Sequence, residues 1–190
     1  MIKFIATLFL LIPTYSHSQS FSDLLERVET LNQKQHHIGH NKIFVVDYSK
    51  KITEKRFYLL DLKNKKIIYR THVGHAWRSG RGKPKRFSNK PNTNKSSLGI
   101  YRIGKKYKSN YFDNAYRLHG LSKTNNNALK RSIVIHDAPV DYVEDPSGMI
   151  LSGLVEQEQL YSDGCFTFFP WDFKDVMRFF DTTELLYAIN

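Results

Sequence analysis

One cysteine and one histidine are the residues of this sequence best suited to nucleophilic chemistry. Cys165 is the only cysteine of the chain, and it directly follows Gly164. His136 ends the apolar segment 131–136, which reads RSIVIH. A thiolate is a strong nucleophile when a histidine takes its proton or stabilises its charge, and a glycine beside it lets backbone amides face a substrate carbonyl. The two residues are 29 positions apart, which neither requires nor forbids contact, so spacing alone leaves the pair a hypothesis.

The first twenty residues, MIKFIATLFLLIPTYSHSQS, have the pattern of a secretory signal peptide. Lys3 supplies the positive charge, residues 4–12 form an apolar run of nine, and small residues follow at 16–18. This pattern predicts a signal peptide over residues 1–18, with cleavage before Gln19. The apolar run is far shorter than the ~20 residues that span a bilayer, so we expect no stable membrane span after cleavage. The expected location is the periplasm or cell envelope of a bacterium.

Export leaves three roles open for the single cysteine. It could pair with another molecule, remain buried and inert, or act as a reactive nucleophile, because disulfides form in oxidising compartments but need two thiols. The cysteine count alone does not choose among them, so the decision depends on the surrounding sequence.

The charge balance suits an anionic partner. The chain has 29 basic and 18 acidic residues, and loss of Lys3 with the signal peptide leaves a net charge of +10. Such a surface favours polyanions such as anionic lipid or cell-wall polymer, and export argues against nucleic acid. The basic residues are scattered, however, as at 63–66, 83–86 and 105–108, so a solvated basic surface is the simpler interpretation. The oligomeric state is not specified by the sequence.

The elements that must position Cys165 and His136 are mainly β-strands. Apolar residues at helical spacing predict a short helix over 21–35 with Ser22 as a candidate N-cap, so residues 19–40 form an N-terminal helical segment. From residue 41 to 190 we expect one mainly β domain. Its predicted strands are 42–48, 56–62, 66–73, 99–103, 115–118, 132–136 and 184–189, with a long loop over 79–97 and a short helix over 171–180.

A histidine cluster precedes this domain. His36, His37 and His40 could bind a metal ion, but no carboxylate or cysteine lies nearby in the sequence. A polar connector is the favoured interpretation, and we expect neither a metal site nor an organic cofactor.

The segment from Asn41 to Pro170 resembles the catalytic domain of the murein L,D-transpeptidase family, in its longer-insert branch. The likeness runs through "VGHAWRSG", "SSLGIY", "RLHGL", "SIVIHD" and "YSDGCF". A histidine at a strand end, followed by a loop and Ser-x-Gly-Cys, is the arrangement typical of that family. The resemblance implies a β-sandwich or barrel of mixed sheets with a few short helices.

The resemblance also implies roles for the residues around the cysteine. Cys165 would be the nucleophile and His136 its general base, held by the backbone carbonyl of Asp137. The amides of Gly164 and Cys165 would form the oxyanion site, and Ser162 would shape the turn.

Further residues match family segments expected to line the substrate cleft. The chain departs from the family by placing Asp163 before the Gly-Cys pair and Asp137 after the histidine. It also lacks the arginine that often follows the cysteine, for which Arg86 and Arg117 are possible substitutes. The substrate-binding residues expected from these matches are Ser162, Asp163, His75, Arg86, Ser97, Arg117 and His119, and Tyr107, Tyr111 and Phe112 are candidates for contacting glycan.

The function implied is an exported cysteine acyltransferase that acts on peptidoglycan stem peptides through a Cys165 thioester and is sensitive to carbapenems. Two alternatives remain open. One is an L,D-carboxypeptidase or hydrolase that uses the same Cys/His pair, with water in place of an amine acceptor. The other is a non-catalytic wall-binding relative in which Asp137 and Asp163 mark lost activity.

Overall fold

The computed structural model describes residues 20–33, 39–108, 111–112, 114–138 and 160–190. The expected signal peptide, its cleavage site, His36 and His37 lie outside these residues. Within them, no helix is long and apolar enough to cross a membrane.

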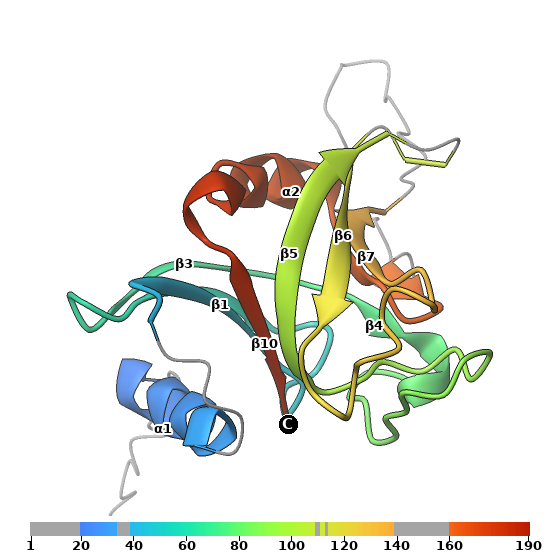
Figure 1. Cartoon of the computed structure of the whole chain (residues 1–190), viewed down its shortest axis with the longest axis horizontal. Coiled ribbons are helices and arrows are strands. Elements are labelled where there is room, and N and C mark those ends of the chain that lie inside the picture. Colours follow the sequence, from blue (N-terminus) through green and yellow to red (C-terminus); the bar gives the residue numbers. More distant parts are fainter. Residues whose placement is uncertain (1–19, 34–38, 109–110, 113, 139–159) are drawn as a thin grey trace, which may run out of the picture.

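The described part of the chain is built on a curled mixed sheet of eight strands in the order β3-β2-β1-β10-β5-β6-β7-β9 (Figure 1). Two of its neighbouring pairs, β1 with β10 and β7 with β9, are parallel, and the others are antiparallel. A two-stranded parallel ribbon, β4 with β8, lies outside this sheet. The strands are β1 (Lys42–Asp47), β2 (Phe57–Asp61), β3 (Lys66–Thr71), β4 (His75–Ala76), β5 (Gly99–Tyr107), β6 (Ala115–Gly120), β7 (Val134–Asp137), β8 (Tyr161–Ser162), β9 (Phe166–Phe168) and β10 (Leu185–Ile189).

Two helices cover the opposite faces of the sheet (Figure 1). Helix α2 (Pro170–Met177) packs Phe173 and Val176 into the larger core, which also receives Phe166 and Phe168. Helix α1 (Phe21–Gln33) packs Leu24 and Val28 against a second core on the other face. Short 3-10 turns occur at η1 (Trp77–Ser79) and η3 (Phe180–Thr182).

Helix α1 begins at Phe21, as its sequence pattern predicts, but its N-cap differs from the expected Ser22. The amide of Asp23 donates to Ser20 Oγ at 3.1 Å, and the amide of Ser20 donates to Asp23 Oδ2 at 3.2 Å. This reciprocal pair is a capping box, so Ser20 is the N-cap and not Ser22.

The mainly β fold with few short helices is confirmed. The predicted strands 42–48, 56–62 and 66–73 correspond to β1, β2 and β3 within a few residues. Strands β4, β8 and β9 were not predicted, because two or three residues carry too little periodicity to be recognised.

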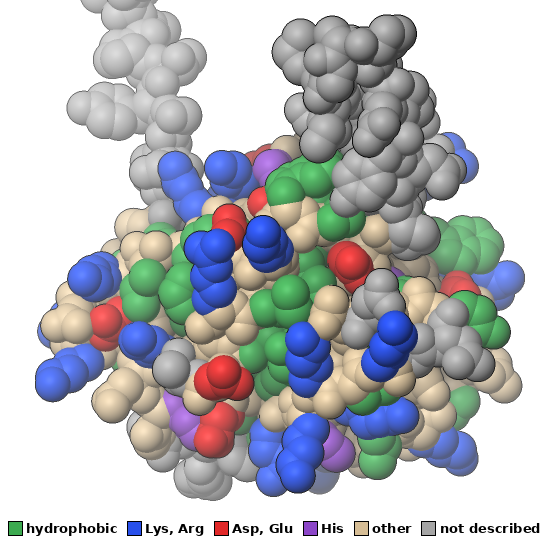
Figure 2. All heavy atoms as spheres, turned by 90° about the horizontal axis from the view of Figure 1, so that it is seen from above, with side chains coloured by type: hydrophobic (Ala, Val, Ile, Leu, Met, Phe, Trp, Pro, Cys, Tyr) green, Lys and Arg blue, Asp and Glu red, His purple; other side chains and the backbone are tan. Residues whose placement is uncertain are grey.

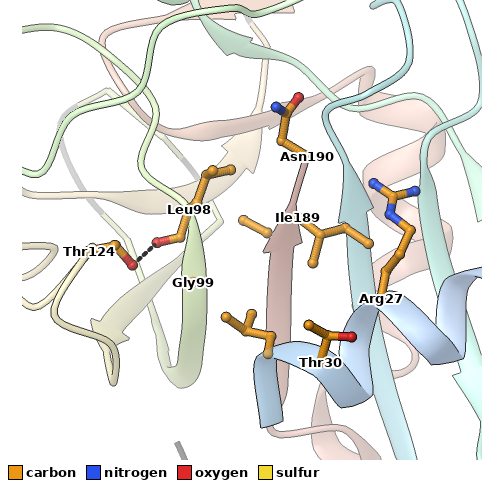
Figure 3. A pocket seen from close by; sticks show the side chains of 9 residues that line it. Arg27, Thr30, Leu98, Gly99, Thr124, Ile189 and Asn190 are labelled. Atoms are coloured by element: carbon orange, nitrogen blue, oxygen red, sulfur yellow. Dashed lines mark hydrogen bonds between the residues drawn. The ribbon is translucent and has the colours of Figure 1, made fainter. Parts of the chain in front are cut away.

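A cavity of about 460 Å³ separates α1 from β10 and the start of β5 (Figure 3). Its walls are mainly apolar, with Ile189 and Leu98 on the sheet side and Thr30 and Arg27 on the helix. The hydroxyl of Thr124 donates to the carbonyl of Leu98 at 2.7 Å and closes one side. Neither Cys165 nor His136 lines this cavity.

The basic side chains are dispersed over the face of the molecule that is seen from above. Figure 2 shows Lys and Arg there among acidic, polar and hydrophobic groups, without a single basic block. On this face the distribution agrees with the scattered pattern of the sequence.

Candidate active site

Cys165 and His136 lie on neighbouring strands. In the parallel pair β7 and β9, Ile135 is opposite Phe166 and His136 is opposite Thr167, which sets Cys165 beside Val134 at the start of β9. Because paired residues share a face and faces alternate, Cys165 and His136 project from the same face, while Ile135 and Phe166 enter the core. Two residues of offset along the strands and one strand spacing put their Cα atoms about 8 Å apart.

The imidazole of His136 is fixed from two sides. Its Nδ1–H donates to the carbonyl of Asp137 at 2.6 Å, which leaves Nε2 with the lone pair. The ring of Phe112 lies over it with 3.8 Å between ring centroids. Burial lowers the pKa of His136, and the hydrogen bond to Asp137 opposes this effect only in part. The result is a neutral imidazole whose free nitrogen can accept a proton.

The Cys165 thiol is also neutral at physiological pH. Burial raises its pKa to about 11, and the Asp163 carboxylate acts in the same direction, while Arg131 acts against it. The Sγ atom donates weakly to the carbonyl of Ser132 at 3.8 Å. The resting pair is therefore thiol and imidazole, and a reaction requires proton transfer from sulfur to nitrogen during attack.

The turn before Cys165 is held by Ser162. The Ser162 hydroxyl donates to the carbonyl of Cys165 at 2.8 Å, and the amide of Gly164 donates to Ser162 Oγ at 3.2 Å. Gly164 has φ +135°, and a Cβ there would lie 2.6 Å from Ile133 Cδ1, so this position requires glycine. Because the Gly164 amide faces Ser162, the amide of Cys165 is the better candidate for an oxyanion donor.

Asp163 lies at the exposed edge of the same turn. One of its carboxylate oxygens accepts a 3.1 Å hydrogen bond from the indole nitrogen of Trp77, a half-exposed residue of η1. This contact joins the turn before Cys165 to the segment that follows β4, and it holds the carboxylate whose charge raises the pKa of the Cys165 thiol.

Arg131 is a site residue that the sequence analysis did not single out. Its guanidinium donates to the Ser88 carbonyl at 2.9 Å, to Ser97 Oγ at 3.2 Å and to the Lys95 carbonyl. A Cβ on Gly164 would lie 3.1 Å from Arg131 Nη2, so this cation borders the turn before Cys165. Arg131 starts the RSIVIH segment, but no short-range pattern reveals that its side chain folds back toward Cys165.

His75 and Ser97 differ from the expectation that they line the cleft. His75 is fully buried, receives a hydrogen bond from Arg56 at 2.7 Å on Nδ1 and donates from Nε2 to the Gly80 carbonyl at 2.7 Å. Burial, with Arg56 beside it, lowers the pKa of His75 to about 4. Ser97 is only 2% exposed and bonds to the Tyr101 hydroxyl at 2.8 Å. Both residues support the wall of the site from behind.

The remaining expected substrate-binding residues are separated. Arg117 and His119 lie on β6 with side chains on the same sheet face as His136, because Arg117 is opposite Val134. Arg117 is exposed and stacks over the Tyr107 ring at 4.4 Å. Arg86 is exposed in the loop between β4 and β5, where its backbone amide donates to the Ser79 carbonyl at 3.0 Å. Arg131 is therefore the arginine adjoining Cys165 among the described residues.

No group of three or more His, Cys, Asp and Glu side chains suited to holding a metal ion occurs among the residues that the structure describes. The chemistry available at this site is that of a thiol, an imidazole, backbone amides and one fixed guanidinium.

The model of the L,D-transpeptidase catalytic domain matches residues 15–189 of the chain. The chain belongs to this family. The family predicted from the sequence is thus confirmed, and in the β7–β9 register Cys165 and His136 lie on neighbouring strands. No curated protein matches the chain in sequence.

Solved structures with a similar fold include other L,D-transpeptidases. The helical cell shape determining protein Pgp2 from Campylobacter jejuni is 14% identical with a TM-score of 0.49, and 77% of this chain and 46% of that chain are covered. An L,D-transpeptidase from Stackebrandtia nassauensis is 14% identical with a TM-score of 0.46, covering 88% and 65%. One from Mycobacterium smegmatis is 9% identical with a TM-score of 0.41, covering 80% and 60%. The chain thus spans about half to two thirds of these proteins, and the likeness carries no argument about substrate.

Proposed function

We propose that this chain is an exported L,D-transpeptidase that transfers the acyl group of a peptidoglycan stem peptide through a thioester on Cys165. The observation that supports the proposal is the β7–β9 register, in which Cys165 and His136 lie on neighbouring strands and project from the same face, with His136 Nδ1 bonded to the Asp137 carbonyl. Membership of the L,D-transpeptidase catalytic domain family supplies the reaction class.

In the first step, His136 Nε2 takes the proton of the Cys165 thiol as sulfur attacks the substrate carbonyl. The Cys165 amide stabilises the negative charge that develops on the carbonyl oxygen. The tetrahedral intermediate collapses, the C–N bond breaks, and the leaving amine receives the proton from His136. The product is a thioester on Cys165 and a released terminal D-amino acid.

In the second step, an amine of another stem peptide attacks the thioester and restores the thiol. Splitting the transfer through a covalent intermediate is the advantage that a sulfur nucleophile offers. Water in place of the amine would make the same site an L,D-carboxypeptidase. Neither step uses a metal ion or an organic cofactor.

Mass spectrometry of the intact protein after incubation with a carbapenem tests the nucleophile. We expect one covalent adduct on the wild-type protein and none on Cys165→Ala. Absence of an adduct on the wild-type protein, together with full cellular function of Cys165→Ala, would favour a non-catalytic wall-binding protein.

Chromatography of the products formed from a disaccharide tetrapeptide tests the acceptor. Cross-linked 3→3 dimers identify a transpeptidase, whereas tripeptide alone identifies a carboxypeptidase. The export that this function requires is checked by following removal of residues 1–18 from the precursor in cells.

A further inference from the structure

The loop between β4 and β5 begins with a concentration of positive charge. Residues 62–112 contain 15 of the 29 lysines and arginines of the chain and neither aspartate nor glutamate. Figure 1 shows the loop beyond β4, on the side of the molecule away from α1. We call residues 77–86 the basic loop. It holds five exposed cations, which are Arg78, Arg81, Lys83, Lys85 and Arg86.

Backbone hydrogen bonds close the basic loop on itself. The Ser79 carbonyl accepts hydrogen bonds from the amides of Lys85, at 2.9 Å, and Arg86, at 3.0 Å. The segment folds back so tightly that a Cβ on Gly80 would lie 3.0 Å from the Lys83 carbonyl oxygen. A short loop whose ends meet in this way is compact, so its cations share one small surface.

The basic loop is also fastened to the rest of the domain at its tip. The amide of Gly82 donates to the Tyr161 hydroxyl at 2.7 Å, and the Gly82 carbonyl accepts from the amide of Ile52 at 2.8 Å. Pro84 is buried beneath the exposed lysines on either side of it. The backbone that presents these cations is therefore fixed in advance, which reduces the entropy lost when a partner binds.

Trp77 adds an exposed aromatic ring to the same surface. It is 50% exposed, and the guanidinium of Arg78 lies over its ring at 4.8 Å from the centroid. Tryptophan is enriched where proteins meet the lipid–water interface, because the indole is amphipathic, and lysines and arginines attract anionic headgroups there. The basic loop thus combines the two features of a surface that meets a membrane.

The carboxylates that border the basic loop bind other groups. Asp163 accepts the hydrogen bond of the Trp77 indole at 3.1 Å, and Glu54 accepts one from the amide of Lys51 at 2.8 Å. Within the described parts of the chain, no ion pair joins a carboxylate to Lys83 or Lys85. The charge of these two lysines is therefore left for a partner.

We propose that the basic loop docks this protein on an anionic phospholipid surface, with its cations on lipid phosphates and Trp77 at the level of the headgroups. The exposed indole favours a lipid surface over a soluble polyanion, which would need the cations alone. Because Trp77 is bonded to Asp163, docking would hold the turn before Cys165 close to the membrane. The proposal does not depend on acyl transfer.

Cosedimentation with lipid vesicles tests the docking. The probes are vesicles of phosphatidylglycerol and phosphatidylcholine, and vesicles of phosphatidylcholine alone. We expect binding to the anionic vesicles only, and release when NaCl is raised from about 0.1 M to about 1 M, where the Debye length falls from about 10 Å to about 3 Å. The apolar residues 4–12, where still present, would bind both kinds of vesicle, so the comparison isolates the contribution of charge.

A pair of double variants separates the basic loop from the net charge. Lys83→Gln/Lys85→Gln should weaken binding to the anionic vesicles about 25-fold, because each lysine near an anionic surface contributes about fivefold. Lys63→Gln/Lys65→Gln is the matched control, since it removes two exposed lysines from the turn between β2 and β3. It should leave binding within about twofold of the wild-type value, because charges remote from the surface are screened. Equal weakening in the two variants would overturn the proposal.

The fluorescence of Trp77 reports whether the indole meets lipid. The chain has two tryptophans, so the emission of Trp171→Phe comes from Trp77 alone. This emission should shift to shorter wavelength with anionic vesicles and stay in place with neutral ones. An unshifted emission from bound protein would overturn the proposal. So would release from the vesicles by short-chain polyphosphate at an equal phosphate concentration, which would assign the basic loop to a soluble polyanion.

Formation of the carbapenem adduct separates this proposal from the proposed function. Lys83→Gln/Lys85→Gln should form the adduct in solution at the wild-type rate, which shows that its weaker vesicle binding is not a failure to fold. A wild-type protein that binds anionic vesicles and forms no adduct contradicts acyl transfer alone. One that forms the adduct and binds neither kind of vesicle contradicts the docking alone.

Discussion

At the scale of single residues, burial is the main cause of the raised pKa of the Cys165 thiol, a backbone hydrogen bond from Val134 opposes it, and two opposite charges modify the result. Burial raises its pKa to about 11, Asp163 raises it further, and Arg131 lowers it. We therefore expect iodoacetamide to alkylate wild-type Cys165 slowly at pH 8, and the plot of alkylation rate against pH should have its inflection near pH 11. Asp163→Asn should speed alkylation at pH 8 and Arg131→Gln should slow it, by about tenfold for each pH unit that the inflection moves, because the thiolate is the reacting form.

Arg131→Lys is the control for these two variants, because lysine keeps the positive charge but cannot make all the hydrogen bonds of the planar guanidinium. A shift in the same direction for Asp163→Asn and Arg131→Gln would contradict the opposing roles. Slow alkylation of Cys165 in Arg131→Lys would mean that Arg131 acts by holding the loop 88–97 in place, and not through its positive charge.

The Phe112 ring sets the environment of the proposed base. It lies over His136 with 3.8 Å between centroids, and burial lowers the pKa of that histidine. Phe112→Ala admits water, so the pKa should rise toward the ordinary value of 6.5 and a larger fraction of His136 should be protonated at pH 6. The acidic limb of the pH profile for carbapenem acylation should then move to higher pH, with a severalfold loss of rate at pH 6.

Tyr111→Ala is the matched control for Phe112→Ala, because Tyr111 is 88% exposed and its ring centroid is 6.4 Å from that of Phe112. The acidic limb should stay in place in Tyr111→Ala. An unmoved or lowered limb in Phe112→Ala would mean that the ring does not set the pKa of His136.

At the scale of elements, Gly74 allows three segments to meet behind the site. Its amide donates to the Thr167 carbonyl of β9 at 2.7 Å, and a Cβ would overlap the Leu160 carbonyl oxygen and Thr167 Oγ1. Gly74→Ala should therefore lower the free energy of unfolding by about 1–3 kcal/mol, as overpacking does, and displace β9 with Cys165. Urea unfolding and the rate of adduct formation measure the two effects.

Gly39→Ala provides the comparison for Gly74→Ala, since a Cβ there meets nothing within 4 Å. Its cost should be confined to the backbone, about 1 kcal/mol, with adduct formation unchanged. An equal loss of unfolding free energy in Gly74→Ala and Gly39→Ala would show that overlap with Leu160 and Thr167 does not cause the destabilisation.

The strands differ in whether local sequence patterns could predict them. Strands β1, β2 and β3 could be predicted because each has five or six residues rich in β-branched and aromatic side chains between turns. The β4–β8 ribbon could not, because each strand has two residues and its partner is some 86 positions away, as from His75 to Tyr161. Such pairing depends on the tertiary fold and leaves no periodic signal.

At the scale of the whole molecule, the order of the sequence motifs was enough to predict the family. The relative positions of Cys165 and His136 follow from the β7–β9 register. His136 and Cys165 could be named from the sequence because a histidine at a strand end and Ser-x-Gly-Cys occur in order. Arg131 could not, because its hydrogen-bond partners Ser88, Lys95 and Ser97 belong to a distant segment that only the fold brings to it. The burial of His75 and Ser97 was equally hidden, since polar residues are expected on the surface unless partners are known.

An ion pair joins the N-terminal helix to the sheet, in addition to the apolar contacts of Leu24 and Val28. Arg27 of α1 donates two hydrogen bonds to Asp47, at 2.6 and 2.9 Å, and Asp47 at the end of β1 is fully buried. Burial acts to raise the pKa of Asp47, but the hydrogen bonds from Arg27 and Ser49 outweigh it and hold the pKa below 3.8. Because the folded-state pKa is depressed, this stabilisation is present above the unfolded-state pKa and is lost as the pH falls through the folded-state pKa.

Arg27→Met should therefore lower the free energy of unfolding by about 3 kcal/mol at pH 7, where it leaves a buried carboxylate without its partner. The difference from the wild-type protein should shrink as the pH falls, first because the buried, unpaired Asp47 of folded Arg27→Met takes up a proton, and then because Asp47 of the folded wild-type protein is protonated as well, below 3.8. Urea unfolding at a series of pH values measures this, with Glu29→Gln, an exposed charge on the same helix, as the control. A difference that stays constant from pH 7 to pH 2 would mean that α1 is held by its apolar contacts with the sheet, through Leu24 and Val28, and not by the ion pair.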